Sequence, residues 1–197
     1  FVIAAALAGT SWLMAFGTIG AGIAAFGSAI VSIVLWIVLR PEVQWPRLPW
    51  FAALYVAWAV ASLTWTAYPS ATLLTLGLLL ATTVQAMFVG SVLTWRELVR
   101  AIASALKWIL ALSIVFELWV SLVWGGPVLP EFVRPDGPVD DPIVYWSRDN
   151  LFEGGRIQGL FGNANLLAVV ALLGMIIFAV RWASHAPRRP LLVGWFA

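Results

Sequence analysis

Long apolar runs separated by short polar breaks dominate the 197-residue chain. Runs of about 20 apolar residues are typical of helices that cross a bilayer, whereas the strands of membrane barrels alternate apolar and polar residues. The pattern therefore predicts an all-α fold, a polytopic transmembrane helical bundle with about six complete spans and the start of a seventh. The six spans are expected at 1–16, 22–39, 48–65, 71–93, 108–124 and 163–182, and the seventh begins at 191.

The polar breaks predict turns, loops and one amphipathic segment. Residues 17–20 and 68–70 have the composition of tight turns, and the proline-containing stretch 40–47 is interpreted as a polar connection. In 95–107, charged residues recur at helical spacing between apolar ones. This spacing predicts an amphipathic helix that lies at the membrane interface and runs into the fifth span. Residues 125–155 hold five prolines and form the one sizeable polar loop.

The basic residues are distributed unequally between the two sides that these spans define. One side carries eight of the eleven: Arg40, Arg47, Arg96, Arg100, Lys107, Arg181, Arg188 and Arg189. Arg134, Arg148 and Arg156 lie on the other side, together with six acidic residues. The positive-inside rule places the first side in the cytoplasm. The loop 125–155 is then expected to be extracytoplasmic and the N-terminus cytoplasmic.

Composition narrows the class of protein further. Hydrophobic residues make up 62% of the chain and charged residues only 10%, which leaves too little polar surface for a water-soluble domain. Because the basic residues are scattered at span ends rather than gathered in a patch, a nucleic-acid partner is not expected. The chain has no cysteine, which excludes disulfides and thiolate metal sites. Since it begins and ends inside apolar runs, residues 1–197 are interpreted as a single transmembrane domain, a fragment of a larger protein.

A polar, glycine-rich stretch leads into the sixth span. Arg156 precedes this span on the expected outer side, where the positive end of the helix dipole also lies. A guanidinium group beside exposed helix N–H groups suits a phosphate, which it can bind through two hydrogen bonds. The alternative is an interfacial arginine that reaches toward lipid headgroups. The glycines that would let the backbone approach a ligand are Gly154, Gly155, Gly159 and Gly162.

Two asparagines and one glutamate complete the candidate site. Asn163 and Asn165 lie where the sixth helix should begin, so capping is the expected role of at least one of them, and capping is compatible with ligand binding. Glu117 is the acidic residue inside a span, a costly placement that is often functional. It could orient Arg156, act as a general base, or be protonated and bonded to a neighbouring helix. A structural or supporting role is favoured over direct catalysis.

Other candidate chemistry is weak. The single histidine, His185, is interpreted as a solvated loop residue in the basic connection 181–190. Four aspartates of the outer loop could hold a divalent cation, but their spacing matches no calcium-loop motif, and a solvated loop is favoured. These four are Asp136, Asp140, Asp141 and Asp149. The sequence contains no Walker loop, no zinc signature and no Ser/His/Asp set, so neither a metal nor a cofactor is expected.

The stretch Arg156-Ile-Gln-Gly-Leu-Phe-Gly-Asn-Ala-Asn-Leu-Leu-Ala168 resembles the motif of the O-antigen ligase-like family. This family includes lipopolysaccharide O-antigen ligases and bacterial surface-polysaccharide polymerases. Its pattern is roughly an arginine, a glycine three residues on, then Asn-Pro-Asn and small apolar residues. Ala164 stands here in place of the proline. The turn at 62–69 and the leucine-rich span after it are similar to the family's N-terminal half.

The resemblance implies a metal-independent membrane glycosyltransferase at the outer face of the bacterial cytoplasmic (inner) membrane. Its donor would be a polyprenyl-diphosphate-linked glycan and its acceptor a lipid or a glycan, with membrane lipids around it. The residues implied in donor binding are Arg156, Gly159, Asn163 and Asn165, with Glu117 in a supporting position behind them. The catalytic base, a histidine of a large outer loop in the family, is expected outside this chain. The main alternative is a multi-span transporter or flippase of a lipid-linked or anionic substrate, and a non-catalytic membrane scaffold is a third.

Overall fold

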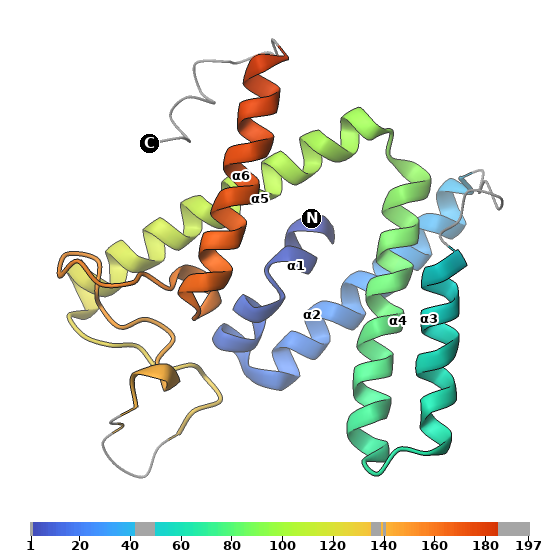
Figure 1. The fold of residues 1–197 in the computed structure, drawn as a ribbon, viewed down its shortest axis with the longest axis horizontal. Coiled ribbons are helices and arrows are strands. Elements are labelled where there is room, and N and C mark those ends of the chain that lie inside the picture. Colours follow the sequence, from blue (N-terminus) through green and yellow to red (C-terminus); the bar gives the residue numbers. More distant parts are fainter. Residues whose placement is uncertain (1, 42–49, 135–138, 140, 185–197) are drawn as a thin grey trace. The chain divides into compact units, whose positions relative to one another are not determined.

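The computed structural model describes residues 2–41, 50–134, 139 and 141–184 (Figure 1). Within these ranges the chain forms helices and loops and no strand, and one isolated antiparallel bridge joins Val128 to Ser147. The α-helices are α1 (Val2–Leu7), α2 (Gly9–Leu39), α3 (Trp50–Ala61), α4 (Pro69–Val92), α5 (Trp95–Trp119) and α6 (Ala164–Ala183). The short turns are η2 (Ser62–Thr64), the π-helix η3 (Val120–Trp124), η4 (Pro142–Val144) and η5 (Gly159–Phe161).

The all-α prediction is confirmed for the described residues, and the predicted number of spans is supported only in part. By length and composition, four helices of the described ranges could cross a membrane: α2, α4, α5 with its π-helical extension to Trp124, and α6. Two of them, α4 and α6, agree closely with the spans predicted at 71–93 and 163–182, whereas α2 and α5 contain the spans predicted at 22–39 and 108–124 but begin earlier. Many of their large apolar side chains are exposed, as expected where lipid rather than water is the solvent.

The other predicted spans differ from the structure. The apolar helix at Trp50–Thr64 is shorter than the roughly 20 residues that a spanning helix needs, although residues 48 and 49 lie outside the described ranges. The predicted first span is divided between α1 and the beginning of α2, which then continues to Leu39. The turn predicted at 17–20 is present as one non-helical residue, Gly17, at φ 65° and ψ −169°. The expected start of a seventh span at Leu191 lies outside the described residues.

Helix α5 contains both the amphipathic stretch and the predicted fifth span. The amphipathic stretch 95–107 and the fifth span form one helix with no break between them. Its start is fixed by a capping box, in which Thr94 N–H and Oγ1–H donate to Glu97 Oε2 at 2.9 and 2.7 Å and Thr94 Oγ1 accepts the N–H of Glu97 at 3.4 Å. Buried positions then follow one face of the helix at spacings of three or four residues: Ala103, Leu106, Ile109, Ser113 and Glu117.

The chain forms two compact units, with boundaries inside α2 and inside α5. The first unit contains α1, the start of α2, α5 from Val99, the loop after it, and α6. Helix α6 crosses α5 closely, because a Cβ at Gly174 would lie 3.1 Å from Leu110 Cδ1 (Figure 1). The core of this unit consists of Ala8, Leu106, Ile109, Phe161, Leu167 and Val170. The core therefore packs Phe161, at the end of the loop, against α5 and α6.

The second unit contains the rest of α2, α3 and α4. Helices α3 and α4 run side by side, joined by the turn at 65–68, with Pro69 at the first position of α4 (Figure 1). Gln85 of α4 is buried, and its amide donates to Ala25 O at 3.1 Å and to Ser28 Oγ at 3.0 Å on α2. Such hydrogen bonds hold apolar helices together where the hydrophobic effect is weak.

Candidate anion-binding site

The loop after α5 returns to that helix through a short backbone pairing. Val128 N–H donates to Ser147 O at 2.8 Å, and Trp146 N–H donates to Val128 O at 2.7 Å. This pairing places Val128 and Ser147 side by side. The segment that follows, from Ser147 to α6, then packs against α5.

Glu117 organises this segment. Its side chain is buried, at 2% exposure, and both carboxylate oxygens accept hydrogen bonds from the loop. Oε1 accepts the backbone N–H groups of Gln158 at 3.0 Å and Gly159 at 2.6 Å. Oε2 accepts the hydroxyl of Ser147 at 2.8 Å. Three donors from two parts of the loop thus satisfy a carboxylate that would be costly to bury alone.

Gly159 lies where no larger residue fits. Its φ is +55°, in the left-handed region that L side chains rarely adopt. A Cβ at this position would lie 2.8 Å from Ser113 Cβ and 2.9 Å from Ser113 Oγ. The same hydroxyl accepts the N–H of Leu160 at 3.3 Å. The glycine predicted to allow close approach to a ligand therefore allows close approach to α5.

Trp146 fixes the other side of this turn. Its indole N–H donates to the carbonyl of Leu160 at 3.1 Å. Its ring stacks on Phe116 of α5, with centroids 4.6 Å apart. A Cβ on Gly162 would lie 3.4 Å from Trp146 Cδ1. Residues 158–162 are consequently held by α5 from one side and by this tryptophan from another.

Helix α6 begins with Asn163 as its N-cap. Asn163 Oδ1 accepts the N–H groups of Asn165 at 2.9 Å and Leu166 at 3.4 Å. Capping is therefore the role of Asn163, as the sequence predicts for one of the two asparagines. The cap occupies two of the N–H groups at the helix end and leaves that of Ala164 as a donor there.

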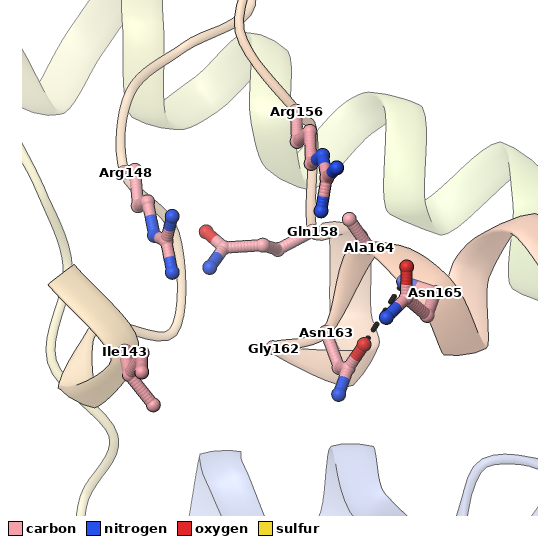
Figure 2. Close-up of a pocket in the computed structure, with 8 residues that line it drawn as sticks. All are labelled: Ile143, Arg148, Arg156, Gln158, Gly162, Asn163, Ala164 and Asn165. Atoms are coloured by element: carbon pink, nitrogen blue, oxygen red, sulfur yellow. Dashed lines mark hydrogen bonds between the residues drawn. The ribbon is translucent and has the colours of Figure 1, made fainter.

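A polar pocket of about 380 Å³ lies beside this helix start (Figure 2). It is lined by Ile143, Arg148, Arg156, Gln158, Gly162, Asn163, Ala164 and Asn165. Figure 2 shows the guanidinium groups of Arg148 and Arg156 on opposite sides of the Gln158 side chain. The pocket thus brings together two cations, neutral amides and a helix N-terminus.

The two arginines of the pocket have no acidic partner among the residues that the structure describes. Among the described residues neither Arg148 nor Arg156 forms an ion pair, whereas Arg134 of the same loop forms one with Glu131 at 3.2 Å. Nε of Arg148 is buried and has no hydrogen-bond partner. Two unpaired guanidinium groups beside the positive end of a helix favour an anion, and their fork geometry suits phosphate oxygens.

The sequence-predicted residues fall into two groups. Arg156, Asn163 and Asn165 line the pocket, as does Ala164, which replaces the proline of the family pattern. Gly159 and Glu117 lie behind the pocket and hold its wall.

Sequence reasoning missed Arg148 and Gln158 as site residues. Arg148 counted only as a loop charge, because its position depends on the pairing of Val128 with Ser147. Gln158 lies between the motif's arginine and its glycine, and its polar character was the one available signal.

The acidic residues of the loop form no cation site in the part of the chain that the structure describes. No group of three or more His, Cys, Asp or Glu side chains occurs there. Asp141 instead caps η4, where Oδ1 accepts the N–H of Ile143 at 2.9 Å. Asp136, Asp140 and His185 lie outside the described residues.

Comparisons with protein-family models, with curated proteins and with solved structures found no match to this chain.

Proposed function

We propose that this chain is part of a membrane glycosyltransferase of the O-antigen ligase or polysaccharide polymerase type. It would transfer a glycan from a polyprenyl-diphosphate donor to a lipid or glycan acceptor at the outer face of the bacterial cytoplasmic membrane. The observation that carries the proposal is the pocket in which neither Arg148 nor Arg156 forms an ion pair with another described residue. Most residues of its lining belong to the stretch 156–168, whose sequence resembles the family motif.

The chemistry requires charge stabilisation more than covalent help from this site. An acceptor hydroxyl oxygen forms a bond to the anomeric carbon of the donor sugar, and the bond from that carbon to the diphosphate oxygen breaks. The diphosphate leaves with the electron pair, and the hydroxyl proton passes to a base expected outside this chain. Arg148 and Arg156 would neutralise the charge that develops on the leaving oxygen, a form of catalysis by donors already in place.

A neighbouring apolar groove suits the lipid part of such a donor. The groove has a volume of about 250 Å³ and an almost wholly apolar lining of small residues and aromatic rings. The lining of the groove includes Trp146 and Leu160, which are joined by a hydrogen bond. Two residues after Leu160, Gly162 lines the polar pocket, so the groove and the pocket are neighbours. A donor with an anionic head and a hydrocarbon chain could occupy both. We assign the groove to the polyprenyl chain of the donor.

The position of Glu117 favours this proposal over the transporter alternative. A transporter would use an intramembrane carboxylate to carry a proton or an ion. Both oxygens of Glu117 instead accept hydrogen bonds from the loop. Its role here is to hold the wall of the pocket.

A transfer assay with the full-length protein in liposomes tests the proposal. R156A should reduce glycan transfer from a polyprenyl-diphosphate donor by about 100-fold or more, the usual effect of removing a donor that stabilises a developing anion. R134A is the matched control, because Arg134 belongs to the same loop but is exposed and paired with Glu131. Normal transfer by R156A at normal expression would refute the assigned role.

A further inference from the structure

Gln158 is a buried, incompletely bonded polar residue in the pocket wall. It is 4% exposed, and its backbone N–H donates to Glu117. Its side chain extends between the two arginines (Figure 2). Its carbonyl oxygen Oε1 is buried and has no hydrogen-bond partner.

A bound anion alone does not satisfy this residue. Leaving a buried carbonyl without a partner is costly. A fully ionised phosphate ester has no P–OH group and offers acceptors only, so it can bind the guanidinium groups but cannot donate to Oε1 of Gln158. Whichever way the amide is turned, it presents an acceptor as well as donors. A ligand that completes the pocket therefore brings a hydrogen-bond donor of its own.

The size and lining of the pocket point the same way. Its volume of about 380 Å³ falls in the ~300–1,000 Å³ range of small-molecule sites and exceeds what one phosphate group fills. Besides the arginines, the lining contains the neutral amide of Asn165 and the apolar side chain of Ile143. Neutral polar groups beside an apolar surface are the usual lining for a molecule with both hydroxyl groups and C–H faces.

We propose that Gln158 recognises the sugar that is attached to the phosphate, by hydrogen bonds to a hydroxyl or acylamino group of its ring. The ligand class is then a glycosyl phosphate rather than a simple phosphate. This inference rests on the proposed function and adds a specificity-determining residue to it. The arginines bind the charge, and Gln158 distinguishes a sugar-bearing ligand from a bare one.

The test compares two probes, glucose 1-phosphate and methyl phosphate, by titration calorimetry on the full-length protein at pH 8, where the phosphate groups of both probes are dianions without a P–OH group. Wild-type protein should bind glucose 1-phosphate more tightly. The variant Gln158→Met keeps the backbone N–H that Glu117 holds, so the wall should stay in place. It should weaken glucose 1-phosphate binding about 3- to 10-fold, the value of one neutral hydrogen bond, and leave methyl phosphate binding unchanged.

The outcomes separate this inference from the proposed function. Gln158 does not recognise the sugar if Gln158→Met weakens the binding of both probes equally or of neither. The same conclusion follows if the wild-type protein shows no preference for glucose 1-phosphate. Either result leaves the proposed anion site standing. If R148A and R156A bind methyl phosphate with wild-type affinity, the assignment of the anion site is wrong. If Gln158→Met weakens the binding of glucose 1-phosphate but not that of methyl phosphate, the inference is supported.

Discussion

Glu117 shows how a single buried carboxylate can determine the form of a loop. Ser113 lies one turn before Glu117 on the same face of α5. Glu117 accepts the N–H groups of residues 158 and 159, and Ser113 accepts that of residue 160. Burial in an apolar unit makes these hydrogen bonds strong and their loss costly. The wall of the anion pocket is therefore attached to α5 by polar contacts from behind.

Replacing Glu117 should destabilise the first unit. E117L leaves the N–H groups of Gln158 and Gly159 and the hydroxyl of Ser147 without an acceptor, at about 1–3 kcal/mol for each buried group. E117Q retains one oxygen and should be intermediate. The measurement is unfolding of the detergent-solubilised protein. The control is E153Q, since Glu153 is an exposed residue of the same loop. E117L unfolding with the stability of E153Q would contradict this role.

Two glycines of the loop form a matched pair. Gly159 and Gly154 both have positive φ, at +55° and +78°, but only Gly159 lies against another segment. G154A should cost about 1–2 kcal/mol from the left-handed backbone alone. G159A adds the contact with Ser113 and should be clearly less stable than G154A in the same unfolding assay. Equal stabilities of the two variants would mean that the close approach of this turn to α5 is incorrect.

At the residue scale, local patterns predicted part of the site. Arg156 and Asn163 could be found because a helix start and its cap involve residues near each other in the sequence. Arg148 and Gln158 could not, because the segments that carry them are held by hydrogen bonds from Ser147 and Gln158 to Glu117, which lies 30 and 41 residues away along the chain. The contact of Gly159 with Ser113 was hidden for the same reason.

The start of α6 combines capping with pocket lining, and substitutions can separate the two. N163A removes the oxygen that accepts two helix N–H groups and should lower stability by about 1 kcal/mol. N165A leaves the cap intact but removes an exposed amide from the pocket. It should keep wild-type stability and weaken ligand binding. An N163A variant as stable as N165A would argue against the cap.

At the element scale, periodicity located helices better than it located their ends and breaks. Residues 163–182 and 71–93 are predicted within two residues of α6 and α4. The charged positions in 95–107 predicted a helix that runs into the fifth span, and α5 is continuous from Trp95, with Glu97 in its capping box. Gly17 breaks the helical backbone of α2 at a single residue, a feature too short for apolar periodicity to resolve.

The orientation of α6 can be measured by cysteine labelling, because residues 1–197 contain no cysteine of their own. Single variants E153C and S184C place thiols at exposed positions before and after α6. A membrane-impermeant maleimide should label E153C in intact cells and S184C only after permeabilisation. The reason is that the positive-inside rule predicts a cytoplasmic location for the basic residues that follow α6. The reverse labelling pattern would place the pocket on the cytoplasmic side.

The central claim is that Arg148 and Arg156 together form a phosphate-binding site. Titration of the full-length protein with inorganic pyrophosphate tests this claim most directly, with R134A as a control for loop charge. R148A and R156A should each weaken binding about 10- to 150-fold, as expected for charge-assisted hydrogen bonds, while R134A binds like the wild type. If the double variant R148A/R156A bound pyrophosphate with wild-type affinity, the pocket would not be the anion site.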